Sequence, residues 1–292
     1  MKAMRILSFL LLVSIWIDLG DQTRSDVLKL IKESGAKTVG VAVYDEKSGS
    51  SLLINEHNIF HAASTMKLPV MMRIFELSEK KMLTMDNRIE VRNSFSSIVD
   101  GSTFSLNRED DGEQTLYGRI GQQAPINELV DKMIVRSSNL ATNILIEKAG
   151  AKESTDLVRR LGGGDMTVRR GVEDAKAFRA GLINTTTAYD LMILLRGILE
   201  RKFLSSESCD QMIEILLKQE FNDGIPAGLP KAVRVAHKTG SITEIRHDAA
   251  IVFPQNDRPY VIVILTQGIK EEKKADSLIA AIAKTVHQAI RK

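Results

Sequence analysis

The stretch Ser64-Thr65-Met66-Lys67 marks the point at which a strand-rich part of the chain gives way to a helix. Behind it, apolar residues recur at helical spacing, at Leu68, Met71, Met72 and Phe75. A separation of three residues places the Ser64 hydroxyl and the Lys67 ammonium on one helix face, one turn apart. A lysine with a depressed pKa can take the proton of such a hydroxyl, and the positive end of the helix dipole favours an oxyanion. The stretch therefore predicts a nucleophilic serine at a strand–helix junction.

The Ser-x-x-Lys pattern alone is weak, because roughly one match is expected by chance in a chain of this length. It also occurs at residues 34–37 and 78–81. Only Ser64 is joined by two further motifs: Ser137-Ser138-Asn139 lies between predicted helices, and Lys238-Thr239-Gly240 ends a predicted strand. Ser-x-x-Lys, Ser-x-Asn and Lys-Thr-Gly, in this order, are the motif set of the serine acyl-transferases that recognise penicillin.

The composition is that of an ordinary globular protein of 292 residues, with 43% apolar and 26% charged residues. A formal net charge of +3, with scattered Lys and Arg, does not predict nucleic-acid binding. The single cysteine, Cys209, excludes an intrachain disulfide, and the five histidines form no HExxH or Cys-rich cluster. No metal or other cofactor is therefore expected.

The N-terminus has the pattern of an export signal. Lys2 and Arg5 precede the apolar run Ile6–Ile17, which at about 12 residues is too short for a stable membrane span. We expect a signal peptide over residues 1–20, cleaved near Gly20, and a periplasmic or secreted mature protein without a membrane span. The alternative is a buried first helix.

Strand patterns occur at both ends of the chain and helical patterns in the middle. The predicted strands cover residues 38–44, 51–54, 232–241, 249–253 and 260–266. The predicted helices cover 25–31, 126–134, 140–148, 154–161, 185–199, 205–218 and 274–290, with Ser25 and Gly35 as the cap and stop of the first. The simplest assembly is an α+β fold, in which a five-stranded antiparallel sheet is covered by the first and last helices and an all-α lobe is inserted in sequence.

We expect a catalytic domain over residues 21–292, with an α/β lobe of residues 25–60 and 231–292 and a helical lobe of residues 61–230. The site is expected between the lobes. Residues 84–124 lack periodicity and are rich in Asp and Gly, which predicts a long solvated loop or insertion.

The chain resembles class A β-lactamases, or the wider class A-like serine hydrolases, from about residue 25 to 290. The resemblance is carried by residues 60–67, 137–143, 171–174 leading into 185–187, 227–230 and 238–241. It implies a β-lactamase/transpeptidase-like fold, a small-molecule β-lactam substrate and a monomer.

The resemblance also implies roles for individual residues. Ser64 would be the acylated nucleophile, Lys67 a base or proton relay, and Ser137 the proton donor to the leaving nitrogen. Glu173 would activate the water that frees the acyl-enzyme. The backbone N–H groups of Ser64 and Ser241 would form the oxyanion hole. Asn139 would hold the substrate side-chain amide, and the carboxylate side of the substrate would be bound by Lys238, Thr239, Gly240, Ser241 and Arg246.

The sequence departs from the family pattern around Glu173. Ala177 stands where the family has an asparagine that helps to hold the water, and the loop is a little shorter than usual. Arg170 is expected to face the uncharged Asn184 instead of an aspartate, and Asn143 to brace the loop.

Two further positions bear on substrate binding. Ser138 replaces the usual aspartate of Ser-Asp-Asn. Arg246 and His247 alternate on a strand, so only one of them can face the cleft, and we expect Arg246 to do so.

These features predict an exported serine β-lactamase that forms a Ser64 acyl-enzyme and deacylates it with water held by Glu173. One alternative is a D-alanyl-D-alanine peptidase with the same acylation machinery. The other is a penicillin-binding receptor or pseudoenzyme that deacylates slowly.

Overall fold

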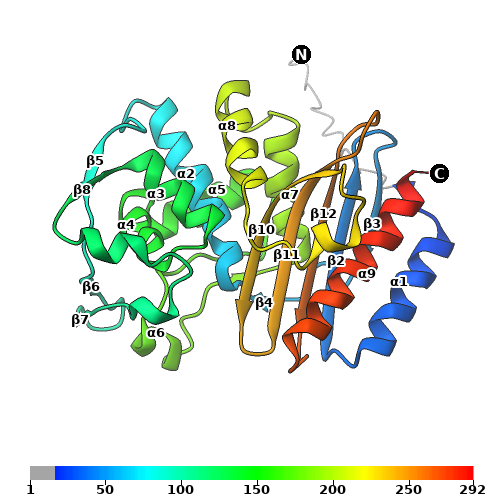
Figure 1. Cartoon of the computed structure of the whole chain (residues 1–292), viewed down its shortest axis with the longest axis horizontal. Coiled ribbons are helices and arrows are strands. Elements are labelled where there is room, and N and C mark those ends of the chain that lie inside the picture. The colour runs from blue at the N-terminus through cyan, green and yellow to red at the C-terminus, as the bar shows by residue number, and fades with distance from the viewer. Residues whose placement is uncertain (1–16, 292) are drawn as a thin grey trace, which may run out of the picture.

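The computed structural model describes residues 17–291, which form two lobes side by side (Figure 1). One lobe contains a sheet with the strand order β1-β3-β2-β12-β11-β10. The five antiparallel strands agree with the prediction, and they are β3 (Ser50–Ile54), β2 (Thr38–Asp45), β12 (Tyr260–Gln267), β11 (Ile245–Phe253) and β10 (Arg234–Ile242). A sixth strand, β1 (Ile17–Asp18), was not predicted and pairs in parallel with β3.

The predicted signal peptide lies mostly outside the described residues. Of its last residues, Ile17 and Asp18 form β1, and the backbone N–H of Leu19 donates to Ser51 O at 3.0 Å. Cleavage near Gly20 would therefore remove this edge strand from the sheet.

Both faces of the sheet are covered, which explains the nearly continuous apolar sequence of β12. Tyr260, Ile262 and Ile264 face a core shared with α1 (Asp21–Ser34) and α9 (Glu272–Ile290). Val261, Val263 and Leu265 alternate with them and pack into the core on the other side, which contains α7 (Ala188–Leu199). The terminal helices therefore cover one face, as predicted, and the helical lobe covers the other.

Several predicted boundaries are corrected. Helix α1 begins at Asp21, with Gly20 at its N-cap position, so the expected cap at Ser25 is wrong, while Gly35 ends the helix in the left-handed conformation with φ of 70°. Strand β11 begins at Ile245 instead of 249, because its polar residues 246–248 pair with β10 and break the apolar pattern that the sequence analysis relied on.

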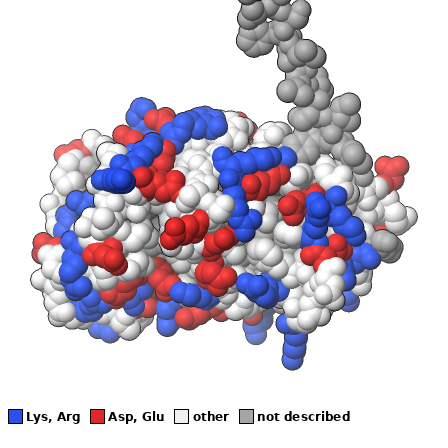
Figure 2. Space-filling model, turned by 90° about the horizontal axis from the view of Figure 1, so that it is seen from above, with Lys and Arg blue, Asp and Glu red and all other residues white. Residues whose placement is uncertain are grey.

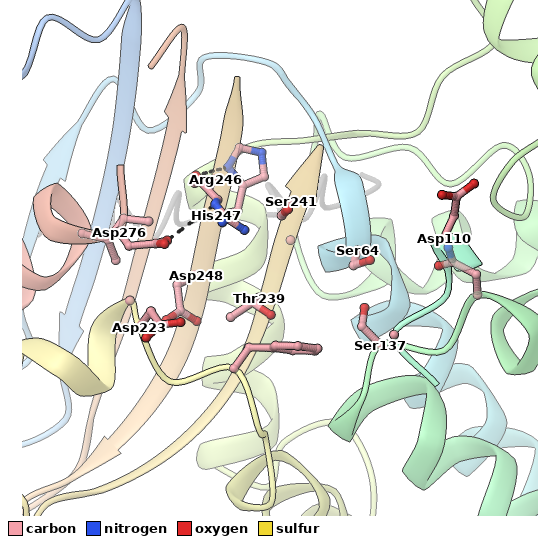
Figure 3. Close-up of a pocket in the computed structure, with 16 residues that line it drawn as sticks. Ser64, Asp110, Ser137, Asp223, Thr239, Ser241, Arg246, His247, Asp248 and Asp276 are labelled. Carbon is pink, nitrogen blue, oxygen red and sulfur yellow. Dashed lines mark hydrogen bonds and ion pairs between the residues drawn. The ribbon is translucent and has the colours of Figure 1, made fainter. Parts of the chain in front are cut away.

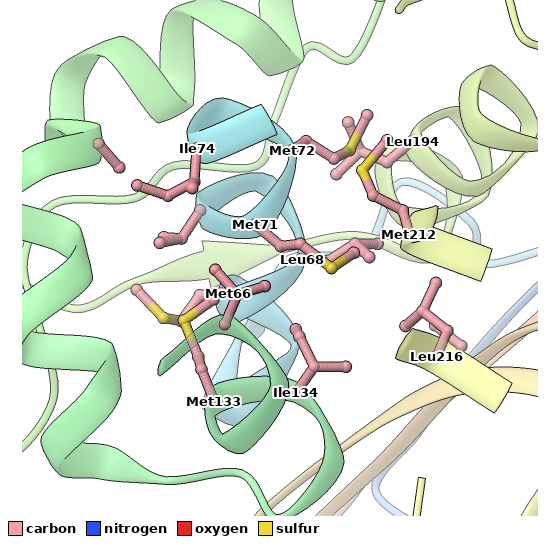
Figure 4. Close-up of a cluster of buried hydrophobic side chains, with 14 of the residues drawn as sticks. Met66, Leu68, Met71, Met72, Ile74, Met133, Ile134, Leu194, Met212 and Leu216 are labelled. Carbon is pink, nitrogen blue, oxygen red and sulfur yellow. The ribbon is translucent and has the colours of Figure 1, made fainter. Parts of the chain in front are cut away.

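The helical lobe is built around α2 (Lys67–Glu79), which is buried on nearly all sides, as expected for the central helix of a lobe. Methionine, leucine and isoleucine side chains of neighbouring helices meet around it in Figure 4. The other helices of this lobe are α3 (Ile126–Val135), α4 (Asn139–Ala149), α5 (Ala151–Arg160), the short α6 (Ala175–Arg179) and α8 (Ser206–Leu217). This arrangement buries the first residue of α2, Lys67.

Most residues of the segment 84–124 are exposed, as its composition suggested, but the segment is more ordered than a loop. It contains two small antiparallel ladders and two 3-10 turns, and its Asp111 and Glu113 are buried. The elements are β5 (Arg88–Glu90) with β8 (Gln123–Pro125), β6 (Phe95–Ser96) with β7 (Thr103–Phe104), η2 (Arg108–Asp110) and η3 (Thr115–Arg119). Buried carboxylates need partners: Asp111 accepts from the N–H of Leu140 at the start of α4, and Glu113 is paired with Lys132 and Arg136.

Acidic and basic side chains are interspersed over the face shown in Figure 2. Within residues 17–291, no helix is both long and apolar enough to cross a membrane.

Candidate active site

Ser64 lies in a short 3-10 turn, η1 (Ala63–Met66), that leads directly into α2. The turn is held by β4 (Phe60–His61), which pairs with β9 (Thr185–Thr186), and by the N–H of Ala62, which donates to Asn184 O at 2.8 Å. Ala63 has a φ of 45°, a strained value for a residue with a Cβ atom. Strain of this kind is typical of functional turns and is sustained by the surrounding structure.

Gly240 allows strand β10 to approach this turn. A Cβ atom at Gly240 would lie 3.0 Å from Thr65 Cγ2 and 3.2 Å from the backbone nitrogen of Ser64. Any larger residue would therefore push the edge strand away from the nucleophile. The Lys-Thr-Gly motif needs glycine here for this steric reason.

Lys67 is completely buried, and its ammonium is held by the helical lobe. Nζ donates to Ser137 O at 2.6 Å, to Ser137 Oγ at 3.0 Å and to Asn139 Oδ1 at 3.0 Å. Burial lowers the pKa of Lys67 to about 7, although the charges of Asp111 and Glu173 oppose this shift. Near neutral pH a large fraction of Lys67 is therefore an uncharged amine that can accept a proton.

Ser137 connects the two buried lysines of the site. Its Oγ accepts from Lys67 Nζ at 3.0 Å and from Lys238 Nζ at 3.1 Å, and its φ of 56° places it at a sharp bend before α4. Lys238 also donates to Thr239 O at 2.9 Å. Burial, followed by the nearby charge of Lys67, holds the pKa of Lys238 well below its usual value. The hydroxyl of Ser137 is thus placed to exchange protons with a lysine on either side.

Asn139 joins this network to Glu173. Its Oδ1 accepts from Lys67, and its Nδ2 donates to Glu173 Oε1 at 2.8 Å. Glu173 has a φ of 62°, and its Oε2 accepts from the backbone N–H of Asn107 at 3.4 Å. Although the residue as a whole is exposed, partial desolvation of its carboxyl raises the pKa of Glu173, and the nearby Asp111 and Asp110 add to this effect.

The loop that carries Glu173 is held by hydrogen bonds of Asn143 and Asp174. Asn143 accepts from the N–H of Val172 at 2.7 Å and donates to Val172 O at 3.0 Å, which confirms its expected bracing position. Asp174 is buried, caps α6 through the N–H of Ala177 and accepts from Ser97 Oγ at 3.0 Å. The carboxylate of Asp174 is thus a buried part of the support of this loop.

Arg170 and Asn184 meet, but through the backbone of Arg170 and not through its guanidinium. Asn184 Oδ1 accepts from the N–H of Arg170 at 3.2 Å, and its Nδ2 donates to Arg170 O at 3.0 Å. The guanidinium instead donates to Leu182 O and Gly171 O, each at 2.9 Å. Backbone carbonyls thus take the place of a charged partner in this loop.

The sequence analysis missed two residues that support the site, Asn107 and Asp111. Asp111 accepts from the N–H of Leu140 at 2.8 Å and from Tyr117 Oη at 3.1 Å, which fixes the start of α4. Both residues lie in the segment 84–124, which was predicted to be a solvated loop or insertion. Only the three-dimensional structure places them here, because neither residue belongs to a recognisable motif.

Two cavities meet at Ser64. One has a volume of about 400 Å³ and is also lined by Ser137, Thr239, Ser241 and Arg246 (Figure 3). The other, of about 650 Å³, extends past Glu173 to the exposed apolar side chains of Phe178 and Ile242. Within the described part of the chain, no group of three His, Cys, Asp or Glu side chains is arranged to hold a metal ion.

Arg246 and His247 point to opposite faces of β11, as alternation requires. Arg246 pairs across the sheet with Ser241 and lines the smaller cavity with it, but its Nη2 is hydrogen-bonded to Glu272 Oε2. His247 is buried, with Nε2 3.0 Å from His61 O, and burial lowers its pKa to about 4. Both residues border the cavity, but only Arg246 brings a cation to it.

The fold, the turn that holds Ser64 and the hydrogen-bonded Lys67–Ser137–Lys238 set match the motif arrangement of penicillin-recognising serine hydrolases. The sequence profile described as the Beta-lactamase enzyme family matches residues 22–290, and the chain belongs to that family.

Similar proteins agree with this family assignment. A Beta-lactamase from Bacteroides uniformis is 26% identical over 87% of this chain and 86% of its own length. Another from Bacillus licheniformis is 26% identical over 92% of this chain and 84% of its own length. Among solved structures, PBP-A is 26% identical, with a TM-score of 0.79 over 93% of this chain and 96% of PBP-A. The β-lactamase/penicillin-binding-protein fold predicted from the motifs is thereby confirmed.

Proposed function

We propose that this protein is a serine β-lactamase that hydrolyses the β-lactam amide through an acyl-enzyme on Ser64. The observation that carries the proposal is the buried hydrogen-bond network in which Ser137 Oγ lies between Lys67 Nζ and Lys238 Nζ. Such a network supplies both a base for the nucleophile and a proton for the leaving nitrogen.

This network supports the following acylation step. The uncharged amine of Lys67 takes the proton of Ser64, whose oxygen attacks the β-lactam carbonyl carbon. The C–N bond then breaks, Ser137 gives its proton to the nitrogen, and the ammonium of Lys67 returns a proton to Ser137. The N–H groups of Ser64 and Ser241 stabilise the oxyanion in this proposal.

Deacylation requires a second base. The carboxylate of Glu173 would remove a proton from a water molecule that attacks the ester carbon, and Ser64 regains its proton when the ester bond breaks. The hydrogen bond from Asn139 to Glu173 supports this role, because it joins the carboxylate to the same network as Lys67.

Ala177 favours a second candidate, a penicillin-binding protein or D-alanyl-D-alanine peptidase that is acylated but deacylates slowly. This residue is fully buried in α6 and offers no side-chain group to hold a water beside Glu173. A mutant of the structurally similar PBP-A, 27% identical with a TM-score of 0.78 over 92% of this chain and 96% of that chain, has been solved as an acyl-enzyme complex with penicillin G. In either case we propose that the chain is exported through residues 1–20.

The deciding experiment is intact-mass spectrometry of the protein mixed with benzylpenicillin. Wild type should show an adduct within seconds that disappears within an hour, while the Ser64→Ala variant shows none. Ser78→Ala, the matched control in the competing Ser-x-x-Lys pattern, should react like wild type. Labelling that survives in Ser64→Ala would refute the proposed nucleophile, and a wild-type adduct lasting an hour would favour the second candidate.

A further inference from the structure

The turn that carries Ser64 is also held by a side chain outside the catalytic motifs, that of His61. The backbone N–H of Ala63 donates to His61 Nδ1 at 3.0 Å. Ala63 is the residue with the strained φ of 45°, and its N–H precedes that of Ser64, the proposed oxyanion donor, by one residue. The hydrogen bond to His61 therefore fixes the backbone immediately before the nucleophile.

His61 is itself anchored on other elements. It belongs to β4, where it pairs with Thr185, and its carbonyl oxygen lies 3.0 Å from Nε2 of the buried His247. Its ring lies edge-on to Phe178 of α6, with ring centroids 6.2 Å apart. Because its backbone and its ring contact separate elements, His61 can hold the turn in place.

The hydrogen bond to Ala63 sets the protonation state of the ring. A nitrogen that accepts a hydrogen bond carries no hydrogen, whereas both nitrogens of a protonated imidazole are donors. Only the neutral ring, with its proton on Nε2, can therefore accept from Ala63 at Nδ1. A protonated ring would point an N–H at the N–H of Ala63, and the hydrogen bond would be replaced by repulsion.

The cations around His61 favour the neutral ring. Burial lowers the pKa of His61, and the positive charge of Arg170 adds to this effect. On β11, the buried His247 has a pKa lowered to about 4 and is neutral over most of the acidic range. On α6, Lys176 is ion-paired with another segment and Arg179 is exposed. The charge that acts on the ring is therefore mainly that of Arg170.

Two acids, Glu173 and Asp174, border the larger cavity together with His61. Glu173 accepts from Asn139, and Asp174 accepts from Ser97 and from the N–H of Ala177. Strand β9, with which β4 pairs, consists of two threonines and brings no charge. The carboxylates beside the cavity are thus engaged by other donors.

We propose that neutral His61 is a positioning residue for the nucleophile turn, and that protonation of its ring at acidic pH releases the N–H of Ala63 and slows acylation of Ser64. The inference rests on the proposed function, because acylation is the step that it concerns. It makes the site sensitive to acid through a second residue besides Lys67.

The first test replaces the acceptor. His61→Asn keeps a side-chain oxygen that can accept from the N–H two residues later, as in an Asx turn, but does not titrate. His61→Phe keeps a ring and removes the acceptor. At pH 8, the single-turnover acylation rate with benzylpenicillin should fall about 3- to 10-fold in His61→Phe, the range for one hydrogen bond, and match wild type in His61→Asn. His57→Asn, at a mostly exposed histidine four residues earlier, is the matched control and should also match wild type.

The second test is the pH profile. Wild type and His61→Asn both contain Lys67, so the titration of Lys67 cancels in the ratio of their acylation rates. The ratio of wild type to His61→Asn should fall about 3- to 10-fold between pH 8 and pH 4, over the range in which NMR shows the His61 ring gaining its second proton. NMR of wild type at pH 8 should also find the single ring proton on Nε2.

A constant ratio, a His61→Phe rate equal to wild type, a His61→Asn rate as low as that of His61→Phe, or a ring proton on Nδ1 at pH 8 would each overturn the inference. A fluorophosphonate probe for nucleophilic serines is used in parallel. If this probe gives the expected order of rates while benzylpenicillin forms no adduct, the inference is supported and the proposed function is refuted.

Discussion

The two walls of the site differ in how completely their polar groups are satisfied. The proposed catalytic wall, called the catalytic wall below, belongs to the helical lobe and consists of Lys67, Ser137, Asn139 and Glu173. The proposed binding wall, called the binding wall below, belongs to the sheet and consists of Thr239, Ser241 and Arg246. In the catalytic wall the buried Lys67 has three hydrogen-bond acceptors within 3.0 Å of Nζ. In the binding wall the partly buried Arg246 is paired with two acids, and its Nε has no hydrogen bond.

This difference follows from what each wall has to do. Proton transfer needs fixed distances between groups whose pKa values are matched, and the side chains of Lys67, Ser137, Asn139 and Glu173 are accordingly joined by hydrogen bonds. Binding needs groups that can exchange one partner for another when a substrate arrives. Substitutions in the catalytic wall should therefore reduce the reaction rates strongly, and substitutions in the binding wall should reduce kcat/KM less.

The strongest test of the catalytic wall is Lys67→Met, which keeps the buried volume but removes the base. Loss of general-base assistance should slow acylation by about 10²- to 10⁴-fold. The measurement is the rate of adduct formation with benzylpenicillin under single-turnover conditions. An acylation rate within a few fold of wild type would show that another group removes the proton of Ser64.

The pH dependence of wild-type acylation tests the same residue without mutation. The lowered pKa of Lys67, about 7, means that the amine loses its proton as pH rises through that value. Because only the uncharged form can accept a proton, the acylation rate should rise with pH and level off above about 7. A rate that is flat between pH 5 and 9 would contradict this assignment.

Glu173→Gln should separate deacylation from acylation. Glutamine preserves the shape and can still accept from Asn139, but it cannot act as a base. Deacylation should slow by about 10²- to 10⁴-fold, so that acyl-enzyme accumulates after a single burst. Mass spectrometry after seconds and after an hour measures this persistence. Glu109→Gln, an exposed acid in the neighbouring segment, is the control and should turn over like wild type.

The binding wall is tested by comparing Lys238→Ala with Arg246→Ala. A charge-assisted hydrogen bond contributes about 1.5–3 kcal/mol, so loss of Lys238 should reduce kcat/KM about 10- to 150-fold. Loss of Arg246 should cost less, near the lower end of that range, because Glu272 and Asp276 already share its charge. If Arg246→Ala behaves like wild type while His247→Ala does not, the cleft-facing residue has been assigned to the wrong face of β11.

The smallest expected effect is on stability, from the segment that supports the catalytic wall. Asp111→Ala leaves the N–H groups of Leu140 and Glu113 without their acceptor, which should lower the free energy of unfolding by about 1–3 kcal/mol. Asp131→Ala, which breaks a partly exposed pair with Lys218, should cost less than about 1 kcal/mol. Urea denaturation measures both, and equal effects would show that the buried position of Asp111 has no special importance.

Local patterns predicted much of the fold because they reflect local physics. Alternation and β-branched residues located the five antiparallel strands, and Thr187 and Ser205 cap α7 and α8 through hydrogen bonds with residues three positions later. The same patterns failed where polar residues interrupt an element: β11 was predicted to begin too late, since Arg246, His247 and Asp248 serve the site at the expense of apolar periodicity.

The sequence by itself determined the order of the motifs and predicted the candidate residues within them, because each motif has a fixed spacing along the chain. Only the tertiary structure decided what surrounds them. Asp111 and Asn107 reach the site from a segment without periodicity, and Glu272 and Asp276 reach Arg246 from the C-terminal helix α9. Burial and ion pairing between distant segments depend on packing, and packing sets both the pKa of Lys67 and the availability of Arg246.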